Sequence, residues 1–297
     1  LIATHRRTSR RWLPHEVVPW GAGRDFAAEP WAPEQCQLAP EVAIALETNL
    51  LTEDNLPYYH LALWEIFGRG GVWGEWVRRW TAEEGRHAIV LRDYLTVTRG
   101  LDPVALERGR MDQVSRGYYP DGNGGSRALD PLDGVVYTTL QELATRIAHR
   151  NTGTFTQDPV IEKLTARIAT DENLHYVFYR ELGKAALEIA PSEMMLAINR
   201  QVTGFAMPGL DIPEFKQKAI EIAPDFMLAL LDLARLFRDQ ERLREALEIL
   251  ERAIALEPVQ PQAHFLRAAT LARMSFTREA IESYRRCLAE QPRHMGA

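Results

Sequence analysis

The stretches TAEEGRH (81–87) and TDENLH (170–175) each contain a glutamate three residues before a histidine. Residues three apart on a helix lie on one face, with about 5–6 Å between their Cβ atoms, so both side chains can reach one metal ion. An acidic residue directly precedes the glutamate in both stretches, so the two contexts match. The two candidate ligand pairs are Glu84/His87 and Glu172/His175.

A lone glutamate precedes each pair by about 30 residues, Glu53 in the first case and Glu142 in the second. That spacing is enough for a helix, a turn and a returning helix. One glutamate from each of two helices plus Glu-x-x-His from each of two others is the ligand set of ferritin-like di-iron carboxylate bundles. The quasi-repeat predicts an all-α fold with a ferritin-like four-helix core. Solvated polar helix faces are the alternative.

Four carboxylates and two imidazoles favour a pair of divalent metal ions. Four buried negative charges without cations would be strongly destabilising, whereas two divalent ions neutralise them. Oxygen-rich ligation with two nitrogens and no thiolate suits iron or manganese better than structural zinc, which prefers closed Cys/His sites. We expect two iron ions, with manganese as the less favoured choice.

Side chains next to the candidate ligands are expected to orient them. Glu83 and Asp171 directly precede ligand glutamates, where each carboxylate can reach the histidine of the other pair. His60 and His149 lie seven residues beyond the lone glutamates, about 10 Å along a helix. That distance is too long for the same metal site, so we expect both to be hydrogen-bonded core histidines.

Composition and charge restrict the class of protein. The 297 residues carry a net charge of −6, which argues against broad nucleic-acid binding. Cys36 and Cys287 are far apart, which suggests no disulfide framework and favours the cytoplasm. No apolar stretch approaches the length needed to cross a bilayer. The basic cluster between Arg6 and Arg11 is expected to lie in a frayed, solvated N-terminus, although it can also meet an acidic partner.

The chain divides by composition into three parts. Residues 1–40 are rich in Pro, Trp and Gly and predict an irregular arm laid over a helical body. Residues 41–214 hold long helical patterns and all candidate ligands, and residues 215–297 follow a different pattern. In the second part we expect helices over 41–67, 75–98, 135–150 and 159–189, interrupted by GRGGVWG (68–74), a helix-poor stretch at 118–134 and NTGTFTQDP (151–159).

Three prolines, Pro224, Pro258 and Pro292, recur with a period of 34 residues in the last part. The segment LLDLARLFRDQERLREALEILERAIALEP (230–258) resembles a tetratricopeptide repeat, a second unit follows, and residues 218–224 resemble the end of an earlier one. Generic amphipathic helices are the alternative. The small and apolar positions are filled by Ala234, Phe237, Ala246 and Ala253 in the first unit and by Ala268, Leu271, Ala280, Tyr284 and Cys287 in the second.

Several long motifs resemble those of acyl-[acyl-carrier-protein] desaturases, in particular the actinobacterial, mycobacterial-type branch. The resemblance covers about residues 10–222 and rests on WLPHEVVPW, LLTEDNLPYYH, WTAEEGRH, LQELATRIAHRNTG, ATDENLHYVFYREL and FAMPG. It implies a di-iron enzyme that removes two hydrogens from a saturated acyl chain on acyl carrier protein, using O₂ and two electrons, usually from ferredoxin. The metal ligands implied by the motifs are Glu53, Glu84, His87, Glu142, Glu172 and His175.

Three further residues acquire candidate roles. The resemblance implies that Thr145, three residues after Glu142, places a hydroxyl beside the oxygen site; a threonine bonded to its own backbone is the alternative. Trp76 and Trp80 form a stripe on the helix of Glu84 that can carry electrons to the metal, although core packing is the simpler interpretation.

Two departures from the family pattern bear on function. The repeats stand where the family has further C-terminal helices that help to complete the enzyme, and the N-terminal helix is abbreviated. We expect a homodimeric desaturase domain fused to repeats that bind an unknown protein. Another di-iron oxidase or hydroxylase on the same bundle is one alternative, and a non-catalytic adaptor with a relic bundle is a second.

Overall fold

The computed structural model describes residues 1–117, 130–205 and 227–290, and every regular element in these ranges is a helix. The all-α prediction is therefore confirmed for the described part of the chain. The chain separates into two compact units, Leu1–Asp211 and Ile212–Ala297. No helix within the described ranges is long and apolar enough to cross a membrane.

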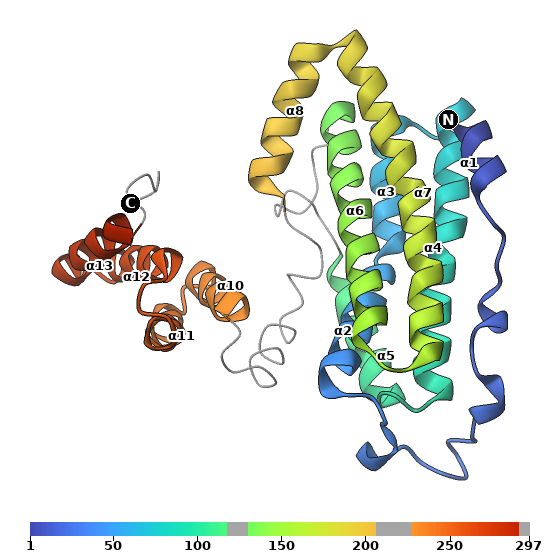
Figure 1. The fold of residues 1–297 in the computed structure, drawn as a ribbon, viewed down its shortest axis with the longest axis horizontal. Coiled ribbons are helices and arrows are strands. Elements are labelled where there is room, and N and C mark those ends of the chain that lie inside the picture. Colours follow the sequence, from blue (N-terminus) through green and yellow to red (C-terminus); the bar gives the residue numbers. More distant parts are fainter. Residues whose placement is uncertain (118–129, 206–226, 291–297) are drawn as a thin grey trace. The chain divides into compact units, whose positions relative to one another are not determined.

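Four helical legs form the bundle of the first unit (Figure 1). The first leg is α2 (Pro40–Glu53) followed by α3 (Leu56–Phe67), and the others are α4 (Gly71–Val97), α6 (Pro131–Phe155) and α7 (Pro159–Ile189). Helix α4 packs against α2, α3 and α7, while α6 runs along α7 and touches α2 and α3. The centre of the bundle is thus lined by all four legs.

Helices α5 (Pro103–Arg116) and α8 (Pro191–Gly204) complete the first unit, and α8 packs on α6 and α7. Helices α5, α6 and α7 all begin at an Asp-Pro pair, in which the aspartate accepts a backbone N–H of the first turn and proline occupies the first helical position. The three capping residues are Asp102, Asp130 and Asp158.

Several expected helix boundaries are wrong, and α4 and α6 begin at Gly71 and Pro131, not at residues 75 and 135. The expected helix 41–67 is broken at Asp54 and Asn55, because Pro57 cannot donate to the carbonyl of Glu53, four residues earlier, and its ring would clash there. Helix α6 continues through NTGTF to Phe155. At Gly153 a Cβ would lie 2.2 Å from Thr165 Oγ1, so glycine permits the close approach of α6 to α7 and the helix continues.

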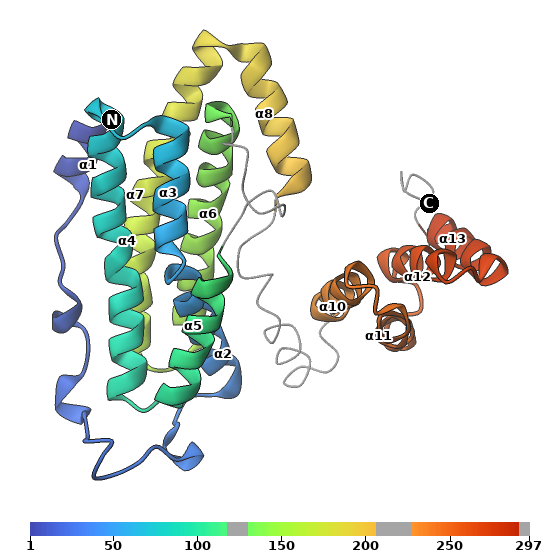
Figure 2. The ribbon, with the colours of Figure 1, turned by 180° about the vertical axis from the view of Figure 1, so that it is seen from behind.

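The N-terminal arm contains more structure than expected. Residues Ile2–Thr8 form α1, which packs on α7, so the prediction of a frayed N-terminus is wrong for these residues. Three short 3₁₀ helices follow, and Figure 2 shows the arm passing along the outside of the bundle. Buried Arg99 holds the arm by donating to Gln35 Oε1 and the Glu29 carbonyl, at 2.7 Å each. The 3₁₀ helices are η1 (Pro14–Glu16), η2 (Trp20–Ala22) and η3 (Pro33–Gln35).

The second unit consists, in its described residues, of two helical hairpins. The first pairs α10 (Met227–Asp239) with α11 (Leu243–Leu256), and the second pairs α12 (Pro261–Arg273) with α13 (Thr277–Glu290). Helix α12 also contacts α10 and α11, so the hairpins stack. Of the positions expected to be small or apolar, those buried are Ala234, Phe237, Ala246, Ala253, Ala268, Leu271, Ala280 and Cys287. Assignment to the tetratricopeptide class stays a prediction, and the expected half-helix at 218–224 lies outside the described residues.

Candidate metal centre

The four legs of the bundle place all six candidate ligands in its interior. Each of these residues is at most 7% exposed. Helix α2 supplies Glu53, α4 supplies Glu84 and His87, α6 supplies Glu142, and α7 supplies Glu172 and His175.

These side chains form two overlapping clusters, in each of which the potential ligand atoms lie within 4.8 Å of one another. One cluster is Glu53, Glu84, His87 and Glu172, and the other is Glu84, Glu142, Glu172 and His175. Glu84 and Glu172 belong to both, so their carboxylates stand where they can bridge two ions. Glu53 and Glu142 each belong to one cluster only, as terminal ligands would.

The two histidines direct their Nδ1 atoms at these carboxylates. His87 Nδ1 lies 3.2 Å from Glu84 Oε2, 3.4 Å from Glu172 Oε1 and 3.6 Å from a Glu53 oxygen. His175 Nδ1 lies 2.6 Å from Glu84 Oε1. The same nitrogen is 3.4 Å from Glu142 Oε2. The Nδ1 atoms are therefore the nitrogens available to a metal ion in each cluster.

The hydrogen bonding of these atoms fits a cation. Buried polar atoms almost always have hydrogen-bond partners, and a buried polar atom that lacks one often faces an ion or a water molecule. Four atoms that face the shared space have no hydrogen bond within the described residues, namely Glu84 Oε1, Glu142 Oε2 and the Nδ1 atoms of His87 and His175. Each cluster contains three carboxylates and one imidazole, all of them buried. Divalent metal ions bind oxygen and imidazole donors of this kind.

Burial competes with the attraction between carboxylates and histidines in this cluster, and the pKa of Glu84 is lowered because the histidines outweigh its burial. Burial raises the pKa of Glu142 well above its usual range, and the neighbouring carboxylate of Glu84 adds to this. Burial lowers the pKa of both ligand histidines, but the surrounding carboxylates outweigh it, so the pKa of His87 and that of His175 are raised. Without metal the cluster therefore retains protons, which a bound cation would displace.

Glu83 and Asp171 make the contacts that the sequence suggested. His175 donates from Nε2 to Glu83 Oε2 at 3.1 Å, and His87 Nε2 lies 3.5 Å from Asp171 Oδ2. Each carboxylate thus faces the histidine of the other Glu-x-x-His pair. A carboxylate on the far ring nitrogen fixes the orientation of a ligating imidazole and increases its basicity.

Thr145 contacts its own helix backbone and a candidate ligand, and its place beside an oxygen site stays a prediction. Its hydroxyl lies within hydrogen-bond distance of the carbonyls of Gln141 and Glu142, and it also reaches Glu172 Oε2 at 2.9 Å. On the same side of the cluster, Trp80 donates from Nε1 to Glu142 Oε1 at 2.8 Å. Two ligand carboxylates are therefore held by neutral donors, Thr145 and Trp80.

The ring of Trp76 lies 6.2 Å from that of His175, but its hydrogen bond goes elsewhere. Its indole donates to the hydroxyl of Tyr179 at 3.0 Å and stacks on Phe178, with 3.4 Å between ring centroids. Both tryptophans are buried and belong to one apolar core cluster with Tyr179. Core packing thus accounts for Trp76, and an electron-transfer role for the pair stays a prediction.

Three residues outside the set of candidate ligands contact carboxylates at the centre in ways that the sequence did not predict. His149 is buried and bonds Glu53 Oε1 through Nε2 at 3.1 Å, so the prediction of a hydrogen-bonded core histidine is confirmed, while its partner was not predicted. Trp12 donates to Asp171 Oδ2 at 2.8 Å, and His5 bonds Glu83. His60 bonds Thr81 but is only partly buried, so the prediction of a core histidine is wrong for this residue. His149 follows Glu142 by seven residues, about two helical turns, which was the only signal of a shared face.

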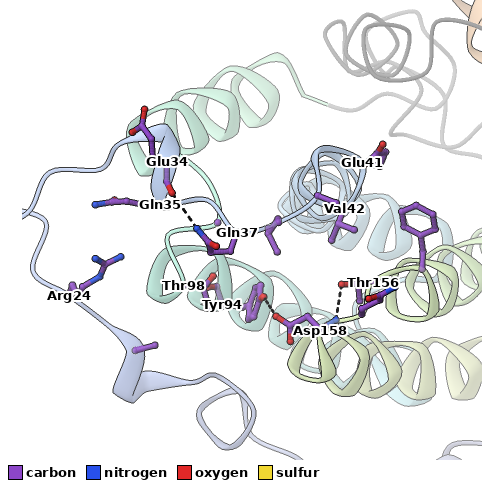
Figure 3. A pocket seen from close by; sticks show the side chains of 16 residues that line it. Arg24, Glu34, Gln35, Gln37, Glu41, Val42, Tyr94, Thr98, Thr156 and Asp158 are labelled. Carbon is purple, nitrogen blue, oxygen red and sulfur yellow. Dashed lines mark hydrogen bonds between the residues drawn. The ribbon is translucent and has the colours of Figure 1, made fainter.

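A groove of about 820 Å³ lies at one end of the bundle, away from the metal centre. Figure 3 shows its polar lining, in which the Tyr94 hydroxyl donates to Asp158 at 2.9 Å. The walls come from the arm, the start of α2, the end of α4 and the start of α7. None of the six candidate ligands lines this groove.

Comparison with known proteins identifies the family. A family model described as fatty acid desaturase matches residues 2–228. The chain belongs to the fatty acid desaturase family. The chain is 46% identical over 224 residues to the Mycobacterium tuberculosis protein named acyl-[acyl-carrier-protein] desaturase DesA1, covering 74% of this chain and 66% of DesA1. It therefore spans slightly less than two thirds of that relative.

Two further relatives support the same family assignment. An Arabidopsis thaliana stearoyl-[acyl-carrier-protein] 9-desaturase is 30% identical over 197 residues, covering 63% of this chain and 49% of the plant protein. The X-ray structure of DesA2 from M. tuberculosis superposes with a TM-score of 0.58 at 25% identity, covering 95% of this chain and 93% of DesA2. The predicted family resemblance is confirmed, and the desaturase family is of the di-iron type.

Proposed function

We propose that this chain is an O₂-dependent acyl-[acyl-carrier-protein] desaturase with two iron ions at the candidate metal centre. The observation that carries the proposal is the sharing of Glu84 and Glu172 by two four-residue clusters, which lets two ions lie side by side between common carboxylates. The names of the relatives support carrier-bound acyl chains as the substrate class.

The reaction removes one hydrogen from each of two adjacent methylenes and, with O₂, two electrons and two protons, yields an alkene and two water molecules. An unactivated methylene has no acidic proton for a general base. Two iron ions held by this donor set would supply the oxidising power, with O₂ as the oxidant. The chain holds the four carboxylates and two imidazoles in a buried space that excludes bulk water.

Individual residues then have defined tasks. Glu83 accepts the Nε2–H of His175, and Asp171 lies beside Nε2 of His87, which leaves both Nδ1 atoms to bind metal. Thr145 places its hydroxyl on Glu172 at the centre of the cluster. Trp80 and Trp76 would carry electrons from a ferredoxin-type donor. We further propose a cytoplasmic homodimer whose C-terminal hairpins bind a protein partner.

The test combines metal analysis with product analysis. The purified protein should hold close to two irons per chain and, once reduced, convert a saturated acyl-ACP to the alkenyl product in a single turnover. The Glu142→Ala and His175→Ala variants should lose metal and product together. Full iron occupancy in both variants would refute the assignment of the centre.

Product chemistry separates the alternatives. An alcohol in place of an alkene would indicate a di-iron hydroxylase on the same bundle. A protein that takes up no metal and forms no product, while its hairpins bind a partner, would be an adaptor. The six intact ligands favour the enzyme over the adaptor, because a relic site would have no need to keep four buried carboxylates.

A further inference from the structure

His5 is the one buried residue of α1, the helix that opens the chain. The flanking residues Arg6 and Arg7 are exposed, whereas His5 is 5% exposed and lies against the bundle. A histidine is seldom buried without a polar partner, because its ring nitrogens lose their hydrogen bonds to water. The polar partner of His5 therefore indicates why this buried position holds a histidine.

That contact is with Glu83. His5 Nε2 lies 2.8 Å from Glu83 Oε2, the same oxygen that His175 Nε2 approaches at 3.1 Å. The second oxygen, Oε1, accepts from Arg79 Nε at 2.6 Å and from the Ser9 hydroxyl at 3.3 Å. Glu83 is thus fixed on both oxygens, and α1 with the residue after its end supplies two of the four donors.

The chemistry of this triad determines which nitrogen of His175 is free. A carboxylate oxygen only accepts, so both imidazole nitrogens that face Oε2 must carry hydrogen. With hydrogen on Nε2, the neutral ring of His175 presents the lone pair of Nδ1 to Glu84 and Glu142. The two rings also stack, with 5.7 Å between centroids and 21° between planes, which limits rotation of His175.

Neither core packing nor a third metal ion accounts for His5 as well as this contact does. His5 Nδ1 is buried and has no hydrogen bond within the described residues, which is unfavourable. An apolar ring would fill the same space beside Trp76 without that cost, so packing alone does not require a histidine. His5, Glu83 and His175 also satisfy the distance criterion for a metal site. Because Arg79 already neutralises Glu83 and repels a further cation, a third ion is disfavoured.

We propose that His5 is a positioning residue of the metal centre, which acts through Glu83 to fix the orientation and tautomer of His175. The inference rests on the proposed function for the identity of the ions, but it concerns metal affinity and not the reaction. Partners of this kind typically change metal affinity 10- to 100-fold when removed. The effect should fall on the cluster that contains His175 and leave that of His87 nearly unchanged.

The experiment titrates metal-free protein with Co(II), whose visible absorption reports ligation. His5→Phe keeps an aromatic ring but removes the donor, and His5→Gln retains an N–H at a similar distance. We expect one of two Co(II) affinities to fall about 10- to 100-fold in His5→Phe and to be largely restored in His5→Gln. Arg7→Ala, an exposed change in the same helix, is the matched control and should bind like the wild type.

A double-mutant cycle with Glu83→Gln tests the route of the effect. If His5 acts through Glu83, His5→Phe should add little to the loss already caused by Glu83→Gln. Melting of the metal-free variants checks folding, and His5→Leu provides a second donor-free variant if phenylalanine is not accommodated. Wild-type affinity in the folded donor-free variants, additive losses in the cycle, or a third Co(II) ion lost with His5 would overturn the inference. Absence of metal binding by the wild type would instead refute the proposed function.

Discussion

His87 Nδ1 lies 3.4 Å from Glu172 Oε1, so the histidine of one Glu-x-x-His pair lies beside the glutamate of the other. The contact joins α4 to α7 across the centre of the bundle. Each helix consequently contributes to both clusters, and the two metal sites cannot be assigned to one hairpin each. This sharing leads to the first prediction.

Removal of a carboxylate that belongs to both clusters should prevent metal binding in both. Removal of a carboxylate that belongs to one cluster should mainly reduce metal binding in that cluster. We expect Glu84→Ala to lose nearly all iron, and Glu142→Ala to lose about one ion of the two, because Glu142 belongs to a single cluster. Iron per chain, measured by elemental analysis on folded protein, checks this. Equal iron content in the two variants would contradict the bridging arrangement.

Stabilisation by metal should grow as pH rises. In metal-free protein the pKa of Glu142 is raised by burial, and the pKa values of both ligand histidines are raised by carboxylates that outweigh burial. The folded state therefore binds more protons than the unfolded state, and stability falls as pH rises above the unfolded pKa values of 4.5 for Glu and 6.5 for His. Metal binding needs deprotonated ligands and improves over the same range.

The measurement is the melting temperature with and without iron between about pH 5 and pH 8. We expect the difference between the two curves to widen steadily with pH. The pKa of Glu53 is lowered, since bonds to His149 and His87 outweigh burial, so its contribution falls away only below about pH 4.5. A pH-independent difference would show that the cluster does not retain protons when it is empty.

Acyl groups on carrier protein should react much faster than free fatty acids, and this preference should weaken with salt. The carrier is acidic, so an enzyme with a net charge of −6 needs a local basic face. Arg10 and Arg11 are exposed, whereas Arg79 is engaged with Glu83. Arg10→Glu with Arg11→Glu should raise KM about 10-fold for acyl-ACP but not for the free acid.

The control carries the same change of charge elsewhere, at exposed Arg285 and Arg286 of α13. That variant should keep the wild-type KM. Equal turnover of carrier-bound and free substrates, or kinetics insensitive to salt, would argue against a carrier docking face in the arm.

The C-terminal hairpins should contribute to the stability of the whole chain. Solenoid units usually need about three repeats to bury a continuous core, and two hairpins are described here. We propose that the repeats dock on the bundle or on a second subunit. A stop after Ala223 should then lower the melting temperature and promote aggregation although all six ligands remain. If the truncated protein were as stable, soluble and active as the full chain, the repeats would be an independent tether for a partner.

The sequence by itself determined the helical class and the candidate ligands. Residues three apart always share one face of a helix, so the Glu-x-x-His pattern brings its two side chains together in any helix. Glu84/His87 and Glu172/His175 could therefore be recognised from the sequence alone. Helix α7 was predicted at its observed bounds, Pro159–Ile189, since Asp158 and Pro159 provide a local start signal.

Only the tertiary structure decided how residues from distant segments meet. The extension of α6 past Asn151 depends on the packing of Gly153 against Thr165 of another helix, which overrides the local break signal. Likewise, the spacing of residues does not show that His5 bonds Glu83 or that Trp12 bonds Asp171. These partners are 78 and 159 residues apart, and contacts over such separations follow no periodic sequence pattern. A local sequence pattern determines which residues share a face of a helix. Tertiary packing determines which other helix that face contacts.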